Sequence, residues 1–328
     1  MDAYGFGLSS VRFICGTQTL HKKLERKISS FLKMEDTVLF SSAFDANGGV
    51  FQPLFSTDDI ILSDELNHAS IIDGIRLTKA GKEKYRHSDM NSLESLLVKA
   101  RSKRYRIIVT DGVFSMDGDV ADLKSICRLA EKYDSLVMVD DSHATGYIGR
   151  TGRGTPEYCG VQGRIDILST TFGKALGGAS GGCISGRKEI VAMLRQKSRP
   201  YLFSNTLAPA VAGGTLKALE ILSASSALRE QVMYNAGMFK EAMTKAGFTI
   251  VQGETAIVPV MLYDEKKAVA MSSRLLKEGI YVIGFTYPVV PRGKARIRVQ
   301  LSAAHTEADV ANLISAFTKI GKELKIIA

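Results

Sequence analysis

Two residues of this chain, Lys174 and Asp140, form a pattern that suits chemistry at the α-carbon of an amino acid. Lys174 lies among small residues in the stretch Thr-Thr-Phe-Gly-Lys-Ala-Leu-Gly-Gly, and Asp140 ends the apolar run Leu-Val-Met-Val. A lysine amine can hold an aldehyde covalently, and a carboxylate favours the protonated form of a pyridine ring. A cationic pyridine draws electrons from an attached amino acid and makes its α-carbon acidic. The pair therefore predicts a site for the cofactor pyridoxal 5'-phosphate.

Two histidines are candidates for the same site. His143 follows Asp140 by three positions, so it could donate to the phenolic oxygen of the cofactor or orient Asp140. His68 stands in the stretch Asn-His-Ala-Ser, after an apolar run that ends at Leu62, and could stack on the cofactor ring. Structural roles stay open for both histidines, and Asp140 could instead cap the turn after its strand.

A phosphate group needs backbone amides and hydroxyls, and segments close to helix starts could supply them. The stretch Ser-Ser-Ala-Phe-Asp-Ala-Asn-Gly-Gly at residues 41–49 follows a predicted strand, and amides at a helix start bind anions. Glycine-rich turns alone are weak indicators, and their agreement with Lys174 gives them weight. The candidate phosphate ligands are two backbone amides and three polar side chains: Ala43, Phe44, Thr171, Ser204 and Asn205.

Short apolar runs alternate with helical patterns over the first two thirds of the chain. The sequence predicts strands at residues 37–40, 60–62, 107–110, 136–139, 165–169 and 182–185, and helices at 17–34, 69–79, 92–101 and 123–133. Such alternation is typical of a mostly parallel α/β sheet with helices on both faces. Ligands gather beyond the carboxyl ends of the strands in these sheets, which is where Ser42, Asp111, Asp140 and Thr171 would lie.

From about residue 209 the pattern changes to that of a small α+β domain. It predicts helices at residues 209–224, 228–246, 266–278 and 307–324, and strands at 257–262, 281–284 and 296–301. We therefore expect a large cofactor-binding domain at residues 1–215 and a small carboxyl-terminal domain at 216–328. Arg296 and Arg298 alternate along one of these strands, and a guanidinium there could grip a substrate carboxylate. The residues alone leave open which arginine does so, or whether both only cover a strand face.

Composition excludes several other classes of protein. The chain has 328 residues, 45% of them hydrophobic and 23% charged, without a run that could span a membrane or a signal-peptide pattern. The four cysteines are scattered, which favours reduced thiols of a soluble intracellular protein and gives no metal site. The net charge of +9 comes without a nucleic-acid motif, so we expect no nucleic acid as partner. A solvated basic surface and attraction of an anionic CoA thioester both remain compatible with that charge.

Taken together, these stretches resemble the glycine C-acetyltransferases (2-amino-3-ketobutyrate CoA ligases) of the α-oxoamine synthase family, which are fold-type I pyridoxal-phosphate enzymes. The resemblance covers nearly the whole chain. Its strongest segments are residues 10–18, 41–49, 111–118, 139–143, 198–205 and 287–291. Residues 295–305 and the stretch Phe-Asp-Ala-Asn-Gly-Gly resemble the glycine C-acetyltransferases in particular. It implies an aminotransferase-like fold, with a mostly parallel central sheet, helices on both faces and a smaller carboxyl-terminal α+β domain.

The resemblance also implies a role for each site residue. Lys174 would carry the cofactor and later move the α-proton, Asp140 would pair with the pyridine nitrogen, and His68 would stack on the ring near the substrate. His143 and Ser115 would hydrogen-bond the phenolic oxygen. Arg298 matches the carboxylate-binding arginine of the family. The implied phosphate ligands are Ala43, Phe44 and Thr171 of one subunit, with Ser204 and Asn205 from its partner in a homodimer with shared active sites.

The implied reaction joins glycine and acetyl-CoA to 2-amino-3-oxobutanoate and CoA. It is reversible and belongs to the breakdown of threonine to glycine, so association with threonine dehydrogenase is a further expectation. The resemblance places such a protein in the bacterial cytoplasm or, in a eukaryote, in the mitochondrion. A sister enzyme with another acyl-CoA or amino acid, and a truncated, catalytically silent subunit, are the alternatives.

The family carries a further segment before the residues that match Tyr4–Gly7, including an Asn-Tyr-Leu-Gly stretch with an asparagine that contacts substrate. This stretch is absent here. Because the missing stretch contacts the substrate, the prediction of the cofactor site is expected to be more secure than the prediction of the glycine site.

Overall fold

The computed structural model describes residues 1–251 and 253–328 and divides into two compact units. The first unit comprises residues 1–114 and 121–225, and the second comprises residues 115–120 and 226–328. The boundary expected at residue 215 falls inside helix α10 (Pro209–Ala224), all of which belongs to the first unit because it packs against α1 (Thr19–Leu32).

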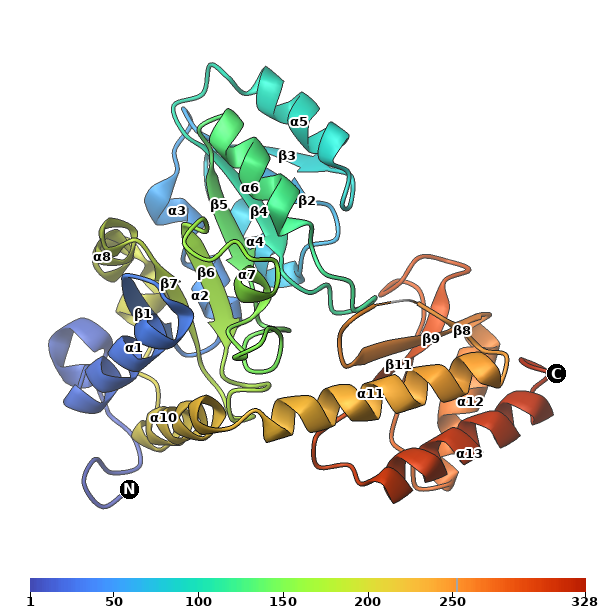
Figure 1. The fold of residues 1–328 in the computed structure, drawn as a ribbon. Helices are drawn as coiled ribbons and strands as arrows, with labels where there is room; N and C mark the ends of the chain where they lie inside the picture. Colours follow the sequence, from blue (N-terminus) through green and yellow to red (C-terminus); the bar gives the residue numbers. More distant parts are fainter. Residues whose placement is uncertain (252) are drawn as a thin grey trace. The chain divides into compact units, whose positions relative to one another are not determined.

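A seven-stranded sheet forms the centre of the first unit, with the strand order β1-β7-β6-β5-β4-β2-β3 (Figure 1). Strand β7 runs antiparallel to both of its neighbours, while the other pairs are parallel, so the predicted mostly parallel sheet is confirmed. The strands are β1 (Asp36–Phe40), β2 (Ile60–Asp64), β3 (Gly81–Tyr85), β4 (Arg106–Asp111), β5 (Leu136–Asp140), β6 (Ile167–Thr171) and β7 (Gly182–Gly186).

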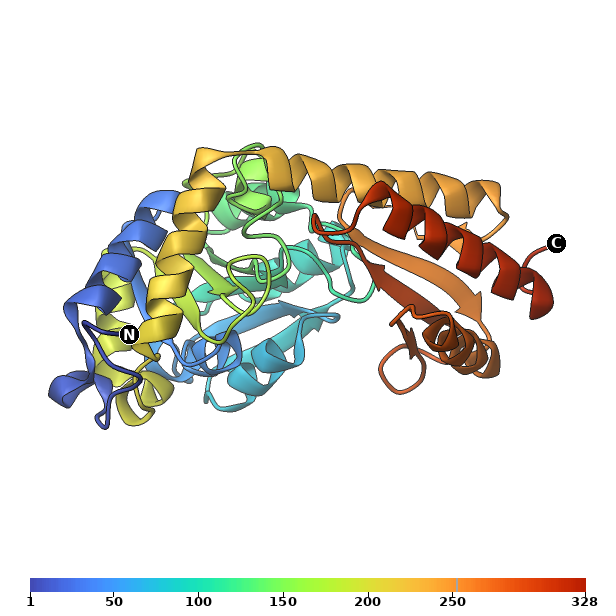
Figure 2. The ribbon, with the colours of Figure 1, turned by 90° about the horizontal axis from the view of Figure 1, so that it is seen from below.

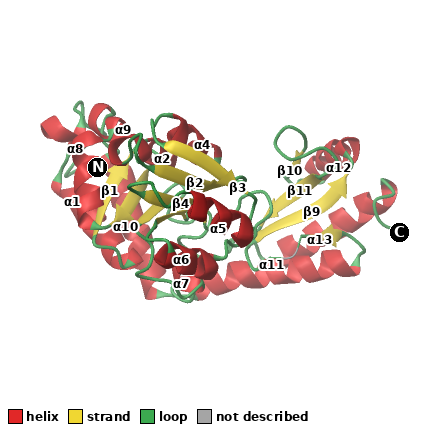
Figure 3. Ribbon diagram, turned by 90° about the horizontal axis from the view of Figure 1, so that it is seen from above, coloured by secondary structure: helices red, strands yellow, loops and turns green. Residues whose placement is uncertain are grey.

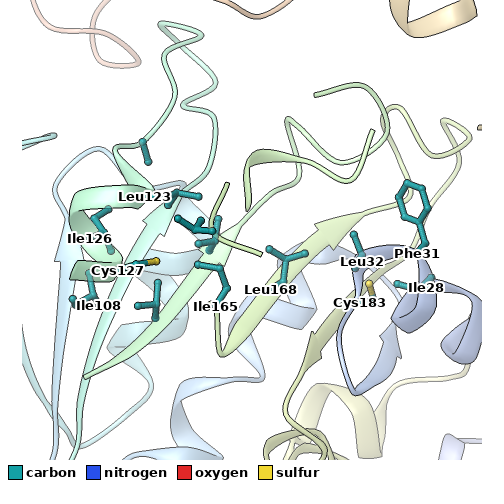
Figure 4. Close-up of a cluster of buried hydrophobic side chains, with 14 of the residues drawn as sticks. Ile28, Phe31, Leu32, Ile108, Leu123, Ile126, Cys127, Ile165, Leu168 and Cys183 are labelled. Atoms are coloured by element: carbon teal, nitrogen blue, oxygen red, sulfur yellow. The ribbon is translucent and has the colours of Figure 1, made fainter. Parts of the chain in front are cut away.

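Helices cover both faces of this sheet, as the sequence predicts, because successive strand residues alternate between two apolar cores. Leu39 belongs to one core, whereas Val38 and Phe40 belong to the other. The first core includes α1, α10, α5 (Met90–Lys99) and α6 (Leu123–Lys132), and Figure 4 shows part of it around Ile108, Leu168 and Cys183. The second core lies under α2 (Ala43–Gly48), α3 (Phe51–Leu54), α4 (Ala69–Arg76), α8 (Lys188–Lys197) and α9 (Arg199–Phe203). The remaining helical turns are the π-helix η1 (Arg12–Gly16) and α7 (Thr155–Tyr158).

Strand β3 is absent from the sequence prediction. Its sequence is Gly-Lys-Glu-Lys-Tyr, it lies at the edge of the sheet, and only Tyr85 is buried. Exposed edge strands carry charged side chains, which discourage pairing with other chains. The apolar pattern by which the other strands are predicted is therefore missing from β3.

In its described residues, the second unit is a four-stranded antiparallel sheet with three helices (Figures 2 and 3). The strand order is β10 (Ile283–Phe285), β11 (Ala295–Gln300), β9 (Ile257–Tyr263) and β8 (Thr249–Ile250). Helix α11 (Ala227–Lys245) packs on β8 and β9, α12 (Glu265–Lys277) packs on β10 and β11, and α13 (Glu307–Glu323) packs against both helices. The predicted small α+β domain is confirmed, although β8 is too short to show in the sequence pattern. No helix in residues 1–251 or 253–328 combines the length and apolar character needed to cross a membrane.

Phe317 is one of the largest fully buried side chains of the second unit. Its buried ring meets the edges of Phe239 and Phe248, with ring centres 5.5 Å and 6.2 Å away. Replacing it, Phe317→Ala, should lower the free energy of unfolding by about 3–5 kcal/mol, since the cavity cannot collapse fully. Urea denaturation followed by circular dichroism measures this, with Val269→Ala on the exposed side of α12 as a control that changes it by less than about 0.5 kcal/mol. Equal effects of the two variants would contradict this packing.

Candidate active site

The carboxyl ends of the parallel strands bring the predicted residues of the first unit to one edge of the sheet. Asp111 at the end of β4 lies in register with Asp140 at the end of β5. Thr171 at the end of β6 lies in register with Gly182, which also faces Phe40 at the end of β1. Polar side chains that are far apart in the sequence therefore meet at a single edge.

Lys174 lies in the loop between β6 and β7, and its Nζ is 2.9 Å from Nε2 of His143. The buried ring of Phe172 anchors this loop, and the amide of Phe172 donates to the carbonyl of Gly181 at 2.9 Å. Lys174 itself is exposed and His143 is half-buried. An amine next to an imidazole at a solvent-accessible edge can exchange protons with it.

Asp140 begins a chain of buried hydrogen bonds that ends at His68. The side-chain amide of Asn47 donates to Asp140 Oδ2 at 2.5 Å and to Ser70 Oγ at 2.9 Å. Ser70 Oγ lies 2.7 Å from Nδ1 of His68, and the amide of Ser142 donates to Asp140 Oδ1 at 2.9 Å. Asn47 and Ser70 are fully enclosed, so this chain fixes the carboxylate of Asp140 at the end of β5.

His68 occupies the N-cap of α4, where Nδ1 accepts a hydrogen bond from the amide of Ser70 at 3.2 Å. A backbone amide can only donate, so a neutral His68 carries its proton on Nε2. Partial burial lowers the pKa of His68 below its ordinary value, the negative charge of Asp140 raises it, and the positive charge of Lys174 lowers it. The pKa of His68 therefore depends on both Asp140 and Lys174, the two residues on which the cofactor prediction rests. The side chain of His68 is also accessible to solvent.

The predicted phosphate ligands gather around Gly181 and Gly182. Ser42 pairs with Gly181 in an isolated bridge, and its Oγ caps α2 by accepting from the amide of Asp45 at 3.0 Å. The first amides of a helix, here those of Ala43 and Phe44, have no acceptor within the helix. A Cβ atom on Gly182 would lie 2.5 Å from the nitrogen of Ala43, so glycine is needed where α2 begins.

Three other predicted ligands lie beside this segment. Thr171 Oγ1 donates to the carbonyl of Gly181 at 3.3 Å and accepts from the amide of Gly173 at 3.1 Å. Ser204 Oγ is 3.1 Å from Ser41 Oγ of the same chain, and Asn205 pairs with Val11 in an isolated bridge. The ring of Phe44 meets the ring of His68 edge-on, with centres 6.5 Å apart, which links the helix start to the histidine.

Two more carboxylates support the site: Asp111, which the sequence places at this edge without a specific task, and Asp141, which the sequence interpretation does not include. Asp111 accepts the amide of His68 at 3.0 Å, and burial, followed by the charge of Asp140, raises the pKa of Asp111 well above its ordinary value. Asp141 accepts from the amide and hydroxyl of Thr155, at 3.1 Å and 2.5 Å, and burial raises its pKa to about 6. The first carboxylate fixes the backbone of His68, and the second secures the loop that follows His143.

In the second unit, Arg296 and Arg298 have different surroundings. Arg296 is buried and forms an ion pair with Asp117. Arg298 is half-buried, donates from Nη1 to the carbonyl of Ser115 at 2.8 Å, and lies over the ring of Phe285. In residues 1–251 and 253–328, no carboxylate lies within ion-pair distance of Arg298, and burial lowers its pKa. Arg298 is thus the arginine with charge available for an anion.

The family described as aminotransferase class I and II matches residues 3–317 of the chain. Together with the sheet and the edge described above, this match defines a fold-type I, aminotransferase-like protein.

Similar proteins of known name show which members of this family the chain resembles. The 2-amino-3-ketobutyrate coenzyme A ligase of Escherichia coli (strain K12) is 58% identical over 330 residues, which cover 100% of this chain and 83% of the relative. The mitochondrial 2-amino-3-ketobutyrate coenzyme A ligase of Mus musculus is 54% identical, over 98% of this chain and 77% of the relative. The serine palmitoyltransferase of S. paucimobilis, solved with a bound PLP–myriocin aldimine, superposes with a TM-score of 0.95 at 30% identity, over 99% and 82% of the two chains. This chain belongs to the aminotransferase class I and II family and, within it, to the α-oxoamine synthases of the 2-amino-3-ketobutyrate CoA ligase type.

The two charges near His68 predict opposite shifts of its pKa. Lys174→Ala removes a cation and should raise the pKa of His68, whereas Asp140→Asn removes an anion and should lower it. NMR titration of the imidazole signals in the ligand-free chain measures both, starting from a wild-type pKa below 6.5. The exposed Lys188, replaced as Lys188→Ala, is the matched control and should leave the signal unchanged. Shifts of the same sign in both site variants would contradict the geometry.

Proposed function

We propose that this chain is a pyridoxal-phosphate-dependent glycine C-acetyltransferase. It joins glycine to acetyl-CoA, gives 2-amino-3-oxobutanoate and CoA, and also runs in reverse, in the breakdown of threonine to glycine. The observation that carries the proposal is the Lys174–His143 pair, 2.9 Å apart, at the edge of the sheet where Asp140 ends β5. The 58% identity to the Escherichia coli ligase supports the choice of glycine and acetyl-CoA.

The residues at this edge fit pyridoxal phosphate. They provide an amine at Lys174, a fixed carboxylate at Asp140, and helix-start amides at Ala43 and Phe44, next to the hydroxyl of Thr171. Because Gly182 has no side chain, the start of α2 can pack directly against β7. Amine, carboxylate and anion site are the three features that the cofactor requires.

When bound, pyridoxal phosphate supplies an electron sink that stabilises negative charge on the α-carbon of glycine. Asp140 would hold the ring nitrogen in its protonated form, because an anion next to a base raises the pKa of that base. Asn47 keeps the Asp140 carboxylate in place with a 2.5 Å hydrogen bond. His143 and Ser115 would donate to the phenolic oxygen of the cofactor, and His68 would stack against its ring.

Lys174 is the group that moves protons. Its Nζ would hold the cofactor aldehyde, and the same amine would move the α-proton of glycine. Nε2 of His143, 2.9 Å away, can accept or give a proton at this nitrogen. Arg298 binds the glycine carboxylate and so orients the C–H bond that breaks.

We further propose that the chain acts as a homodimer with shared sites, in which Ser204 and Asn205 reach the phosphate of the partner subunit. Association with threonine dehydrogenase belongs to the same proposal. The compartment is the cytoplasm in a bacterium or the mitochondrion in a eukaryote, since relatives of both kinds match the chain. The two-domain division, a large cofactor-binding part and a small carboxyl-terminal part, completes the proposal.

The cofactor assignment predicts a visible absorption band when the purified chain is mixed with pyridoxal phosphate. The band should shift on addition of glycine and should be absent in Lys174→Ala, because only that amine holds the aldehyde. Lys188→Ala, an exposed lysine on α8, is the control and should keep the band. A band that persists in Lys174→Ala would refute the assignment, and a band indifferent to glycine but shifted by serine or alanine would point to a sister enzyme.

The role of Arg298 predicts a selective loss of glycine affinity. Arg298→Gln should raise the KM for glycine roughly 10- to 100-fold, the value of a lost charge-assisted hydrogen bond, with little change in the KM for acetyl-CoA. Arg292→Gln is the matched control, since Arg292 is exposed and lies over Tyr287 in the same unit. An unchanged KM for glycine in Arg298→Gln would remove Arg298 from the substrate site.

A further inference from the structure

A short segment at residues 115–120, here called the strap, connects the two units through the backbone. The chain leaves the first unit after Phe114 and re-enters it at Ala121, while the strap belongs to the second unit. The strap carries Ser115, to which the proposed function gives a role, and it makes contacts to β11 and to the turn before β9. These contacts make it part of the second unit.

Arg296 is the main side chain that holds the strap. Its guanidinium forms an ion pair with Asp117 and donates from Nη1 to the carbonyl of Met116 at 3.3 Å, and its Nε donates to the carbonyl of Lys294 at 3.1 Å. The side chain of Arg296 is 5% exposed and that of Asp117 is 31% exposed. Arg296 is thus neutralised, largely enclosed and committed to protein partners.

A second anchor lies further along the strap. The buried hydroxyl of Thr255 donates to the carbonyl of Gly118 at 2.9 Å. Gly118 has a φ of +74°, and a Cβ atom there would lie 2.9 Å from the carbonyl oxygen of Ile257. Lys240 on α11 donates to the carbonyls of Gly253 and Thr255, at 2.6 Å and 2.7 Å. The turn that receives the strap is therefore fixed from its other side.

Arg298 takes its orientation from the first residue of the strap. Side chains alternate along a strand, so Arg296 and Arg298 lie on the same face of β11, and Ile297 lies on the other. Nη1 of Arg298 donates to the carbonyl of Ser115, and the guanidinium carbon lies 4.9 Å from the centre of the Phe285 ring. A guanidinium has five N–H groups in a rigid plane, so fixing one edge directs the others.

We propose that Arg296 and Asp117 are positioning residues that hold the strap, so that the Ser115 carbonyl keeps the guanidinium of Arg298 aimed at the carboxylate of the substrate. The inference rests on the proposed function for the role of Arg298 toward glycine. Two arginines on one strand face thus have separate tasks: Arg296 orders the strap, and Arg298 receives the anion. Because Arg298 is already ordered before the substrate binds, binding does not have to include the loss of conformational entropy of this side chain.

Hydrogen exchange in the cofactor-free chain of 328 residues tests the anchoring without any catalytic readout. Asp117→Ala and Arg296→Gln should each speed exchange in the peptide that covers the strap, by ~10-fold or more, because the ion pair no longer holds it closed. Asp117→Glu keeps the charge and should restore much of the protection. Glu323→Gln breaks the ion pair with Arg274 elsewhere in the second unit and is the matched control, with unchanged exchange in the strap. Unchanged exchange in Asp117→Ala would overturn the anchoring.

Kinetics then test the positioning role. Asp117→Ala should raise the KM for glycine by ~10-fold, through misalignment of Arg298, and leave kcat and the KM for acetyl-CoA much less affected. Asp117→Glu should recover most of the glycine affinity. A loosened strap with an unchanged KM for glycine would overturn the positioning role. If Arg298→Gln also leaves the KM for glycine unchanged, the proposed role of Arg298 fails, whereas the exchange data still decide whether the strap is anchored.

Discussion

The need to bury carboxylates at the end of a parallel sheet governs most of the first unit. Asp111 and Asp140 end neighbouring strands in register, and like charges so placed disfavour each other unless donors surround them. The backbone amide of His68 donates a hydrogen bond to Asp111, and the side-chain amide of Asn47 donates one to Asp140. The helix that carries Asn47 and the helix capped by His68 are therefore placed by the same electrostatic demand. Lys174 contributes the compensating positive charge at this edge.

Sequence patterns predict those parts of the fold whose signal is local. Strands β1, β2, β4, β5, β6 and β7 are apolar runs, and helices such as α1, α6 and α12 have an amphipathic period, so each of these elements is predicted close to its observed position. Strand β3 is not, because its charged residues follow from its place at the sheet edge, which depends on the tertiary structure. The predicted residues at the carboxyl ends of the strands do meet at one edge, since parallel strands must end together.

Partnerships between distant segments are what the sequence does not reveal. The stretch that contains Asn47 stands out for its glycines, yet the task of its side chain depends on Ser70 and Asp140, which come from other elements. The sequence also does not reveal which of Arg296 and Arg298 is available to bind an anion, because the alternation of side chains puts both on the same face of β11. Only the arrival of Asp117 from a segment far away in the sequence neutralises one and leaves the other.

The single reversed strand of the large sheet has a consequence for Lys174. Because β7 runs against β6, the loop between them leaves and re-enters the sheet at the same edge, and Phe172 and Gly181 tie its two ends together. A parallel β7 would require the chain to cross to the opposite edge before starting again. The amine of Lys174 is thus tethered at both sides within a closed hairpin. Its reach can be altered by changing the length of this loop alone, without disturbing any crossover helix.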